Sequence, residues 1–309
     1  MRPVSFDEFV GQPDTVNQLR TAVLASQLRG SPMPHVLFEG PPGCGKTSLA
    51  ASVLPNELKT QVRTVVCSSV AKPEDLLPTL STMRAGEILF LDEIHALPRQ
   101  LFENLYSVME DATLTIVVGE PPNRQPMTIA LPRYTIVGAT TREGLLPEPL
   151  LDRFPVKARL SLYGADDMTK ILAWYFDHHA DHVVINTEAL RLLVPACHGT
   201  PRLAVHLVGL VCDHALVAGS QAITAKEVLS TLAAQRITAE GLNEREFKML
   251  EYLARATRPI GLQTLSSVLD AEVETIERVI EPWLLYIGAV EKTPSGRIAT
   301  SKGRALVSP

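Results

Sequence analysis

The sequence predicts an α/β domain followed by two smaller domains, one all-helical and one with the element order of a winged helix. Short apolar runs alternate with helix-like stretches in the first half of the chain, which is typical of a parallel sheet covered by helices. Four helix-like stretches follow between helix breakers, and then come three helices and a hairpin. We place the domains at residues 1–160, 161–238 and 239–309.

Length and composition narrow the possible classes of protein. A chain of 309 residues is too long for one core of typical size, and its formal net charge of −5 means that nucleic-acid binding must depend on a local basic patch. The four cysteines lack the spacing of a metal site, so we expect reduced thiols and a cytoplasmic protein. With no apolar signal core and no run of about 18 apolar residues, we expect no membrane span.

The elements of the first domain follow a regular order. Residues 14–29 carry apolar side chains at helical spacing. Each apolar run after them is a candidate strand, and a helix-like stretch follows most of these runs. The candidate strands are 36–38, 62–67, 87–91 and 134–139, and the candidate helices are 48–53, 74–83 and 99–109.

Residues 40–47 read G-P-P-G-C-G-K-T, which matches the phosphate-binding pattern G-x-x-x-x-G-K-T. The pattern lies between a candidate strand and a candidate helix, as a P-loop requires. Glycines let backbone N–H groups turn toward phosphate oxygens, and the start of the helix adds partial positive charge. Lys46 would reach the β- and γ-phosphates of ATP, and Thr47 would hold Mg²⁺. The predicted nucleotide-binding residues of this loop are Gly40, Gly43, Gly45, Lys46, Thr47 and Ser48.

The apolar run at 87–91 ends in two acids, Asp92 and Glu93. Ligands bind at the carboxyl ends of strands in open α/β sheets. We therefore expect Asp92 to act on Mg²⁺ and Glu93 to serve as general base toward the attacking water. The alternative is a strand that ends in two solvated acids.

The strand at 134–139 is expected between the strands that carry the P-loop and the two acids. It ends in hydroxyl groups, and a polar residue there could hold the attacking water. Thr141 is our first choice and Thr140 the second. Arg153 is the main candidate for an arginine finger that acts on a neighbouring subunit, with Arg142 as a second possibility. A surface ion pair is the alternative for either arginine.

The helical domain holds two further candidates. Pro201 opens a predicted helix and places Arg202 at its start, where the helix dipole disfavours a cation. Such a local conflict suggests function, so we interpret Arg202 as a second nucleotide sensor. Tyr163 could stack on adenine, although without further support an ordinary core tyrosine at the end of a linker is the better interpretation.

Two hairpins are candidate contact surfaces. Residues 113–130 form two apolar arms around a turn-rich centre, and the hairpin could bind a partner protein or pack on its own domain. The second hairpin lies near the C-terminus, in a stretch with four bases and no acids. These bases suit contacts with DNA phosphates, and a solvated tail is the alternative. They are Lys292, Arg297, Lys302 and Arg304.

Together these motifs resemble the RuvB family of AAA+ ATPases, the bacterial motors of Holliday-junction branch migration. The resemblance runs nearly end to end. Its most specific parts are D-E-I-H at 92–95, G-A-T-T-R at 138–142, G-T-P-R at 199–202 and K-T-P-S-G-R at 292–297. Shorter matches lie at 2–3, 11–12, 109–111, 152–154, 259–262 and 281–282.

The resemblance implies an ATP- and Mg²⁺-dependent DNA motor of recombination and repair. It implies an AAA+ P-loop domain, a helical lid and a winged helix, assembled as a homohexameric ring around duplex DNA. The hairpin at 115–130 would dock on a RuvA-like junction-binding protein. Arg153 would act in trans, and Arg202 would sense the nucleotide from the lid. By similarity, the nucleotide would be lined by Arg2, Glu110, Asp111 and Tyr163, and DNA would be contacted by Lys292 and Arg297.

The chain departs from the family pattern at a few positions. Lys292 and Ser295 replace two arginines of the wing, and Ala96 and His198 stand where the family usually has arginine. Two other functions remain possible at this point. One is a clamp-loader-type AAA+ remodeller, which the missing zinc-type cysteines and the winged helix disfavour. The other is a nucleotide-gated DNA-binding regulator with little turnover.

Overall fold

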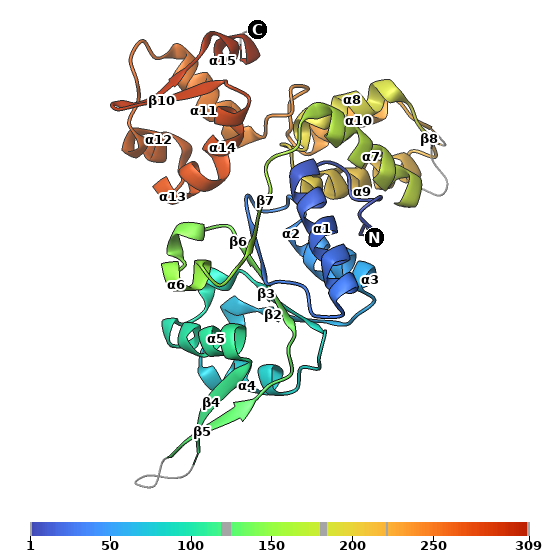
Figure 1. Cartoon of the computed structure of the whole chain (residues 1–309). Coiled ribbons are helices and arrows are strands. Elements are labelled where there is room, and N and C mark those ends of the chain that lie inside the picture. Colours follow the sequence, from blue (N-terminus) through green and yellow to red (C-terminus); the bar gives the residue numbers. More distant parts are fainter. Residues whose placement is uncertain (1, 119–124, 180–183, 221, 308–309) are drawn as a thin grey trace. The chain divides into compact units, whose positions relative to one another are not determined.

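The computed structural model describes residues 2–118, 125–179, 184–220 and 222–307. The chain divides into two compact units, Met1–Tyr163 and Gly164–Pro309. Figure 1 labels the helices and strands of both. In the part of the chain that is described, none of the helices has the length and apolar character needed to cross a membrane.

The first unit is built on a five-stranded parallel sheet. The strand order is β2-β3-β6-β1-β7. This order confirms the predicted place of β6 between β1 and β3. We did not predict β7, an edge strand in which only alternate side chains are buried. The strands are β1 (Val36–Glu39), β2 (Val62–Val66), β3 (Ile88–Asp92), β6 (Thr135–Thr140) and β7 (Val156–Arg159).

Helices flank this sheet and confirm the predicted α/β architecture (Figure 1). Helix α5 packs Leu101 and Leu105 into the same buried cluster as Leu89 and Leu91 of β3. The helix after the P-loop runs from α2 through a π-helical turn into α3. The helices are α1 (Pro13–Arg29), α2 (Lys46–Ser48), the π turn Leu49–Val53, α3 (Leu54–Leu58), α4 (Pro73–Ser81), α5 (Arg99–Asp111) and α6 (Glu148–Leu151).

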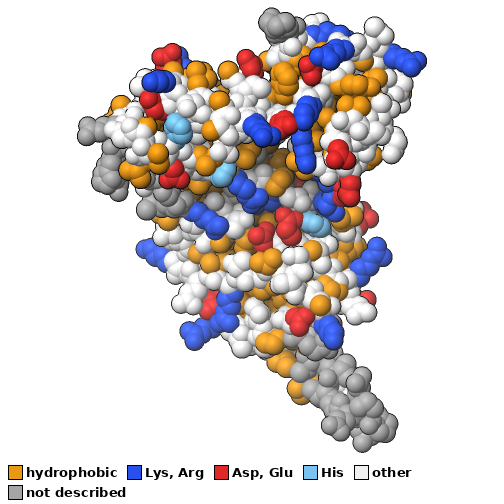
Figure 2. All heavy atoms as spheres, turned by 180° about the vertical axis from the view of Figure 1, so that it is seen from behind, with side chains coloured by type: hydrophobic (Ala, Val, Ile, Leu, Met, Phe, Trp, Pro, Cys, Tyr) orange, Lys and Arg blue, Asp and Glu red, His pale blue; other side chains and the backbone are white. Residues whose placement is uncertain are grey.

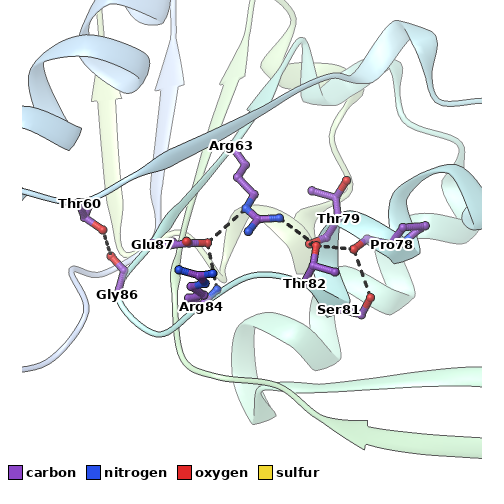
Figure 3. Close-up of polar contacts among 9 residues, drawn as sticks. All are labelled: Thr60, Arg63, Pro78, Thr79, Ser81, Thr82, Arg84, Gly86 and Glu87. Carbon is purple, nitrogen blue, oxygen red and sulfur yellow. Dashed lines mark hydrogen bonds and ion pairs between the residues drawn. The ribbon is translucent and has the colours of Figure 1, made fainter.

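A polar network ties the edge strand β2 to its neighbours, as Figure 3 shows. The Arg63 guanidinium lies 3.3 Å from the buried carboxylate of Glu87 and donates a 2.9 Å hydrogen bond to the Thr82 hydroxyl at the end of α4. Glu87 also accepts a 3.0 Å hydrogen bond from the backbone N–H of Arg84. A buried carboxylate needs such partners, so this network fixes the edge of the sheet.

The predicted hairpin at 113–130 is confirmed by the antiparallel strands β4 (Thr113–Val118) and β5 (Gln125–Ala130). Its turn lies outside the described residues. In Figure 1 both arms lead away from the sheet. Leu114 at the base is buried with the domain core, whereas Met127 on the second arm is 45% exposed. Figure 2 shows hydrophobic side chains along this part of the surface. The base thus packs on its own domain, and the outer arm presents apolar surface.

The second unit begins with the four predicted helices. Two short strands accompany them and pair in parallel. Each has only two residues, which is too short for hydrophobic periodicity to predict. The elements are α7 (Ala165–His179), α8 (Thr187–Ala196), α9 (Pro201–Val217) and α10 (Ala225–Ala234), with β8 (Val184–Ile185) and β9 (Ala222–Ile223).

The remaining elements confirm the predicted winged-helix order. Helix α13, the π turn and α14 follow one another without a break and form the third predicted helix, and the described residues contain one further helix that we did not predict. The additional helix, α15, packs closely enough on the hairpin that a Cβ atom on Gly303 would lie 2.1 Å from the Ala289 carbonyl oxygen. The elements are α11 (Glu244–Arg255), α12 (Leu262–Leu269), α13 (Val273–Thr275), the π turn Ile276–Ile280, α14 (Glu281–Tyr286), β10 (Val290–Thr293), β11 (Gly296–Ala299) and α15 (Ser301–Leu306).

Candidate functional site

The glycine-rich loop between β1 and α2 has a backbone that requires glycine. Gly40, Gly43 and Gly45 all have positive φ angles, of 139°, 82° and 105°. A Cβ atom on Gly40 would lie 2.1 Å from the Leu160 carbonyl oxygen, and one on Gly45 would lie 2.9 Å from the Phe9 ring. Neither position has room for a side chain. The loop is therefore a tight cradle that leads into a helix, the geometry that binds phosphate.

Lys46 closes this cradle. Its side chain is almost completely buried, and its ammonium group donates to the carbonyls of Gly40 at 2.6 Å and Pro41 at 2.9 Å. These acceptors are neutral, so anionic phosphate oxygens could replace them and bind the ammonium more strongly. Thr47 and Ser48 follow in the first turn of α2. The loop, the lysine and the helix start together fit a nucleoside triphosphate.

Tyr163 and the N-terminal segment lie against the same loop and helix. The Tyr163 hydroxyl donates to the Cys44 carbonyl at 3.2 Å, and the tyrosine is buried. The Ser52 hydroxyl donates to the Pro3 carbonyl at 2.8 Å, which holds the segment containing Arg2 along the helix behind the loop. In this conformation Tyr163 supports the backbone of the P-loop, as a core tyrosine does.

Glu93, which follows the end of β3, meets Thr141, which follows the end of β6. Asp92 is the last residue of β3, and Glu93 adopts a left-handed conformation with φ of 53°. The Thr141 hydroxyl donates to the Glu93 carboxylate at 3.1 Å. His95 Nδ1 lies 3.2 Å from the same carboxylate oxygen and 2.9 Å from the Thr140 hydroxyl. The predicted base and the predicted water-holding residue are thus direct neighbours.

The two candidate threonines differ in their surroundings. Thr140 is fully buried, and its hydroxyl accepts the backbone N–H of Arg142 at 2.9 Å. Thr141 is partly exposed and contacts Glu93, so the geometry favours Thr141 for contact with a water molecule. Our sequence interpretation placed His95 only in a turn. The position of His95 only two residues after Glu93 could have indicated that its side chain lies next to the predicted general base.

The electrostatics of this sheet edge suit a divalent cation that arrives with phosphate. Burial raises the pKa of the Cys67 thiol to about 12, and the nearby charges of Asp92 and Glu93 add to this rise. Burial and the neighbouring Glu143 carboxyl raise the pKa of Glu39 at the end of β1. Among the described residues, no three His, Cys, Asp or Glu side chains form a metal site by themselves. Mg²⁺ commonly binds through one or two protein ligands plus substrate phosphates, which fits Thr47 and Asp92.

Arg153 lies on another face of the first unit, against α5. Its guanidinium lies 2.9 Å from the Glu110 carboxylate and 4.5 Å from the centre of the Tyr106 ring, and it donates to the Pro149 carbonyl at 2.6 Å. Asp111 is the exposed neighbour of Glu110 at the end of α5. The structure thus brings Arg153 into contact with Glu110, which we predicted from a separate segment together with its neighbour Asp111.

The predicted sensor is in the second unit. Arg202 is the second residue of α9, directly after Pro201, and its side chain is exposed. This position confirms the predicted start of the helix.

Lys292 and Arg297 face each other across the β10–β11 hairpin and share one acid. The Glu281 carboxylate is fully buried and lies 2.5 Å from the Lys292 ammonium and 2.7 Å from Arg297 Nε. Glu277 contacts Arg297 at 3.2 Å. The Arg297 side chain is only 12% exposed, whereas that of Lys292 is 52% exposed. Glu281 raises the pKa of the Arg297 guanidinium above its ordinary value.

The basic patch is therefore narrower than the sequence predicted. Arg304 donates to the carbonyls of Ala254 and Ala256 at the end of α11, so it holds two helices together. Arg297 holds the wing to Glu281. Lys302 is exposed, whereas the half-exposed Lys292 pairs its ammonium with Glu281.

The sequence and structure resemble proteins of one family. The family model for the Holliday junction DNA helicase RuvB P-loop domain matches residues 1–160, and the model for the RuvB C-terminal winged helix domain matches residues 239–308. A Holliday junction branch migration complex subunit RuvB from Limosilactobacillus reuteri is 39% identical over 302 residues, which cover 97% of this chain and 88% of that protein. The subunit from Chloroflexus aurantiacus is 40% identical over 304 residues, covering 98% and 86%.

Solved structures agree with these matches. The Thermotoga maritima RuvB Holliday junction branch migration motor superimposes with a TM-score of 0.83 at 34% identity, covering 99% of this chain and 97% of that one. A mutant of the same Thermotoga maritima protein superimposes with a TM-score of 0.86 at 34% identity, covering 99% and 98%.

Proposed function

Because the chain belongs to the RuvB family of ATP-driven branch-migration motors, we propose that it hydrolyses ATP to move duplex DNA through four-way junctions in recombination and repair. The observation that carries this proposal is the contact between Glu93 and Thr141 at the sheet edge that also ends in Asp92. This arrangement supports hydrolysis as well as nucleotide binding. It therefore argues against a regulator that binds nucleotide with little turnover.

Each chemical role follows from the position of a side chain. Lys46 would exchange its carbonyl partners for the β- and γ-phosphate oxygens. Thr47 and Asp92 would hold Mg²⁺, which neutralises charge on the phosphates when it is bound. Glu93 would accept the proton of the attacking water while Thr141 orients that water. The backbone of the cradle would position Gly40, Gly43, Gly45 and Ser48 around the phosphates, with Arg2, Tyr163 and Arg202 as further contacts.

The active assembly would be a homohexameric ring with ATP at the subunit interfaces. Arg153, Glu110 and Asp111 share one face, which supports their action on a neighbour's nucleotide as a group. The exposed outer arm of the hairpin at 115–130 supports docking of a RuvA-like protein. We place this complex in the cytoplasm. We also retain the domain limits 1–160, 161–238 and 239–309, in line with the ranges that the two family models match.

The primary test is ATP turnover of Glu93→Gln with and without linear duplex and four-way-junction DNA. Removing a general base should lower turnover by roughly 10²–10⁴-fold. Nucleotide affinity should remain, because the P-loop is intact. Glu188→Gln, an exposed acid in the first turn of α8, is the matched control. Full turnover by Glu93→Gln would refute the catalytic assignment, and wild-type turnover indifferent to DNA would favour a protein remodeller.

Action of Arg153 across an interface can be tested by mixing two inactive variants. Arg153→Ala and Glu93→Gln should each lack DNA-stimulated turnover alone. In mixed rings, some interfaces would combine an intact Glu93 with an intact Arg153, so part of the activity should return. If mixing at every ratio restores nothing although mixed oligomers form, Arg153 does not act in trans.

A further inference from the structure

The turn between α8 and α9 carries a histidine in an uncommon backbone conformation. His198 has a φ angle of 47°, a region that few residues other than glycine occupy. Gly199 follows, also with a positive φ angle of 61°. The Thr200 N–H donates to the Cys197 carbonyl at 2.8 Å and closes the turn. Such a conformation persists only where its surroundings hold it in place.

The His198 ring contacts three separate parts of the C-terminal region. Nε2–H donates to the Gly241 carbonyl at 2.8 Å and lies 3.4 Å from the Glu246 carboxylate on α11. The ring stacks on Trp283 of α14, with centroids 4.9 Å apart and planes 17° from parallel. The linker around Gly241, which joins α10 to α11, and two helices of the winged helix thus contact the helical domain through one imidazole.

The contact is tightly packed. The His198 side chain is 17% exposed, and Glu246 is fully buried. A Cβ atom on Gly241 would lie 2.4 Å from the Pro195 backbone, so the linker lies directly against the end of α8. Packing this close transmits movement, because neither side can shift without displacing the other.

Two buried polar atoms at this contact have no hydrogen-bond partner among the described residues. They are Oε1 of Glu246 and Nε1 of Trp283. A buried polar atom without a partner is costly, and it needs a physical explanation. A second arrangement of the contact, in which these atoms gain partners, would provide one. A two-state element of this kind is what couples distant sites.

We propose that His198 is a positioning residue that transmits movement of α9, which begins with Pro201 and Arg202, to the winged helix. The inference rests on the proposed function, in which Arg202 senses the nucleotide and the wing contacts DNA. It adds the physical connection between these two events. Only three residues separate His198 from Arg202, so a rotation at the start of α9 must move the imidazole against Trp283 and Glu246.

The first experiment measures how the nucleotide changes DNA affinity. The dissociation constant of the full-length protein for duplex DNA is measured with ATPγS and with ADP, and the ratio of the two values reports the coupling. Coupled sites commonly change affinity by roughly 5–150-fold. In His198→Ala the ratio should fall toward one, while ATPγS and ADP still bind. A merely structural residue would weaken both DNA affinities equally and leave their ratio unchanged.

The chain offers a matched control in His178. This histidine also stacks on a tryptophan, Trp174, with centroids 4.2 Å apart, but both residues belong to α7. His178→Ala removes the same ring from the same kind of stack without touching the contact with the winged helix. It should keep the wild-type ratio.

A second readout does not depend on a variant at His198. The chain has two tryptophans, so Trp174→Phe leaves Trp283 as the only one. Exchange of ADP for ATPγS should change the emission of Trp283, because the neighbouring imidazole moves. No change in emission, or a wild-type affinity ratio in His198→Ala, would overturn the inference. If the DNA dissociation constant of the wild-type protein is the same with ATPγS and ADP, the proposed motor function would be refuted instead, even if the emission of Trp283 changes.

Discussion

The P-loop and the wing each hold a cation with partners from their own chain, but the partners differ in charge. Lys46 donates to two neutral backbone carbonyls. Arg297 is bound by the fully buried carboxylate of Glu281 and by Glu277. Both side chains are mostly buried. One cation is therefore held by groups that a phosphate can displace, and the other is already neutralised.

This difference decides what each cation can do for a ligand. A phosphate that draws Lys46 from the carbonyls of Gly40 and Pro41 leaves two neutral acceptors behind. A DNA phosphate that drew Arg297 away would leave the Glu281 carboxylate buried with less compensation, which costs free energy. The geometry of the P-loop allows Lys46 to exchange carbonyl partners for phosphate, whereas Glu281 stabilises the wing through its contacts with Lys292 and Arg297. We expect DNA contact to depend most on the exposed Lys302, then on Lys292, which is half exposed although it pairs with Glu281, and least on the buried Arg297.

The largest effect should come from the exchangeable cation. Lys46→Met keeps the length and packing of the side chain but removes its charge. ATP turnover should fall by roughly 10²–10³-fold, because a charged donor to the transferred phosphate is lost. Thermal stability without nucleotide should change little, since the Gly40 and Pro41 carbonyls that accept from Lys46 are neutral.

Turnover and binding of a fluorescent ATP analogue would check this, with Lys157→Met, an exposed lysine of β7, as control. If Lys46→Met unfolds without nucleotide, the ammonium holds the fold together and the contrast with the wing disappears.

The P-loop could be predicted from sequence because its pattern is local. Gly40, Gly45 and Lys46 lie within seven residues, and their backbone requirements are fixed by the turn itself. The strand at 134–139 could be assigned to the sheet because most of its residues are apolar, and every position of β6 is buried in the structure.

The contacts of Glu281 with Lys292 and Arg297, which we call the clamp, could not be predicted, because they join residues that are close in the fold but distant in the sequence. Glu281 is 16 residues from Arg297, and nothing in the local pattern indicates that a helix will bury its carboxylate beneath the hairpin. The contact of His95 with Thr140 joins residues 45 positions apart. Helix α15 was missed because its basic residues and Gly303 resemble a solvated tail, and only the contact of Gly303 with Ala289 explains that glycine.

The second prediction removes the charge of the clamp. Glu281→Gln leaves Lys292 and Arg297 next to a neutral amide. The free energy of unfolding should fall by about 1–3 kcal/mol, because a buried charged partner is lost. Urea unfolding followed by circular dichroism would measure it. Glu251→Gln, which removes an exposed partner of Arg255 on α11, should cost less than about 1 kcal/mol. An equal loss of unfolding free energy in both variants would mean that the buried ion pairs of Glu281 stabilise the protein no more than the surface pair of Glu251.

The third prediction concerns a buried acid without a strong cation partner. Burial raises the pKa of Glu246 to about 8 from an ordinary value of 4.5. Between these values the folded state holds a proton that the unfolded state has lost, so stability falls as pH rises toward 8. Burial lowers the pKa of His198 from its ordinary value of 6.5, which lowers stability only on the acid side of 6.5.

Between pH 6.5 and 8 the contribution of His198 is therefore absent, and that of Glu246 remains. The free energy of unfolding should decrease there with a slope of at most about 1.4 kcal/mol per pH unit. Glu246→Gln should flatten the slope, while Glu281→Gln should retain it. A slope that survives in Glu246→Gln would assign the pH dependence to another group.

The smallest effect should be on the salt dependence of DNA binding. Each phosphate contact contributes about 0.9 to the slope of log affinity against log salt concentration. Lys302→Ala should reduce that slope by about one contact without a large loss of stability, because its side chain is exposed. Lys292→Ala should reduce the slope by a similar amount and also lower stability, because it removes one cation from the buried Glu281 carboxylate. Arg297→Met should instead lower the free energy of unfolding and leave the slope nearly unchanged. If Arg297→Met folds normally and loses one contact from the slope, the arginine leaves Glu281 to bind DNA, and the wing exchanges partners as the P-loop does.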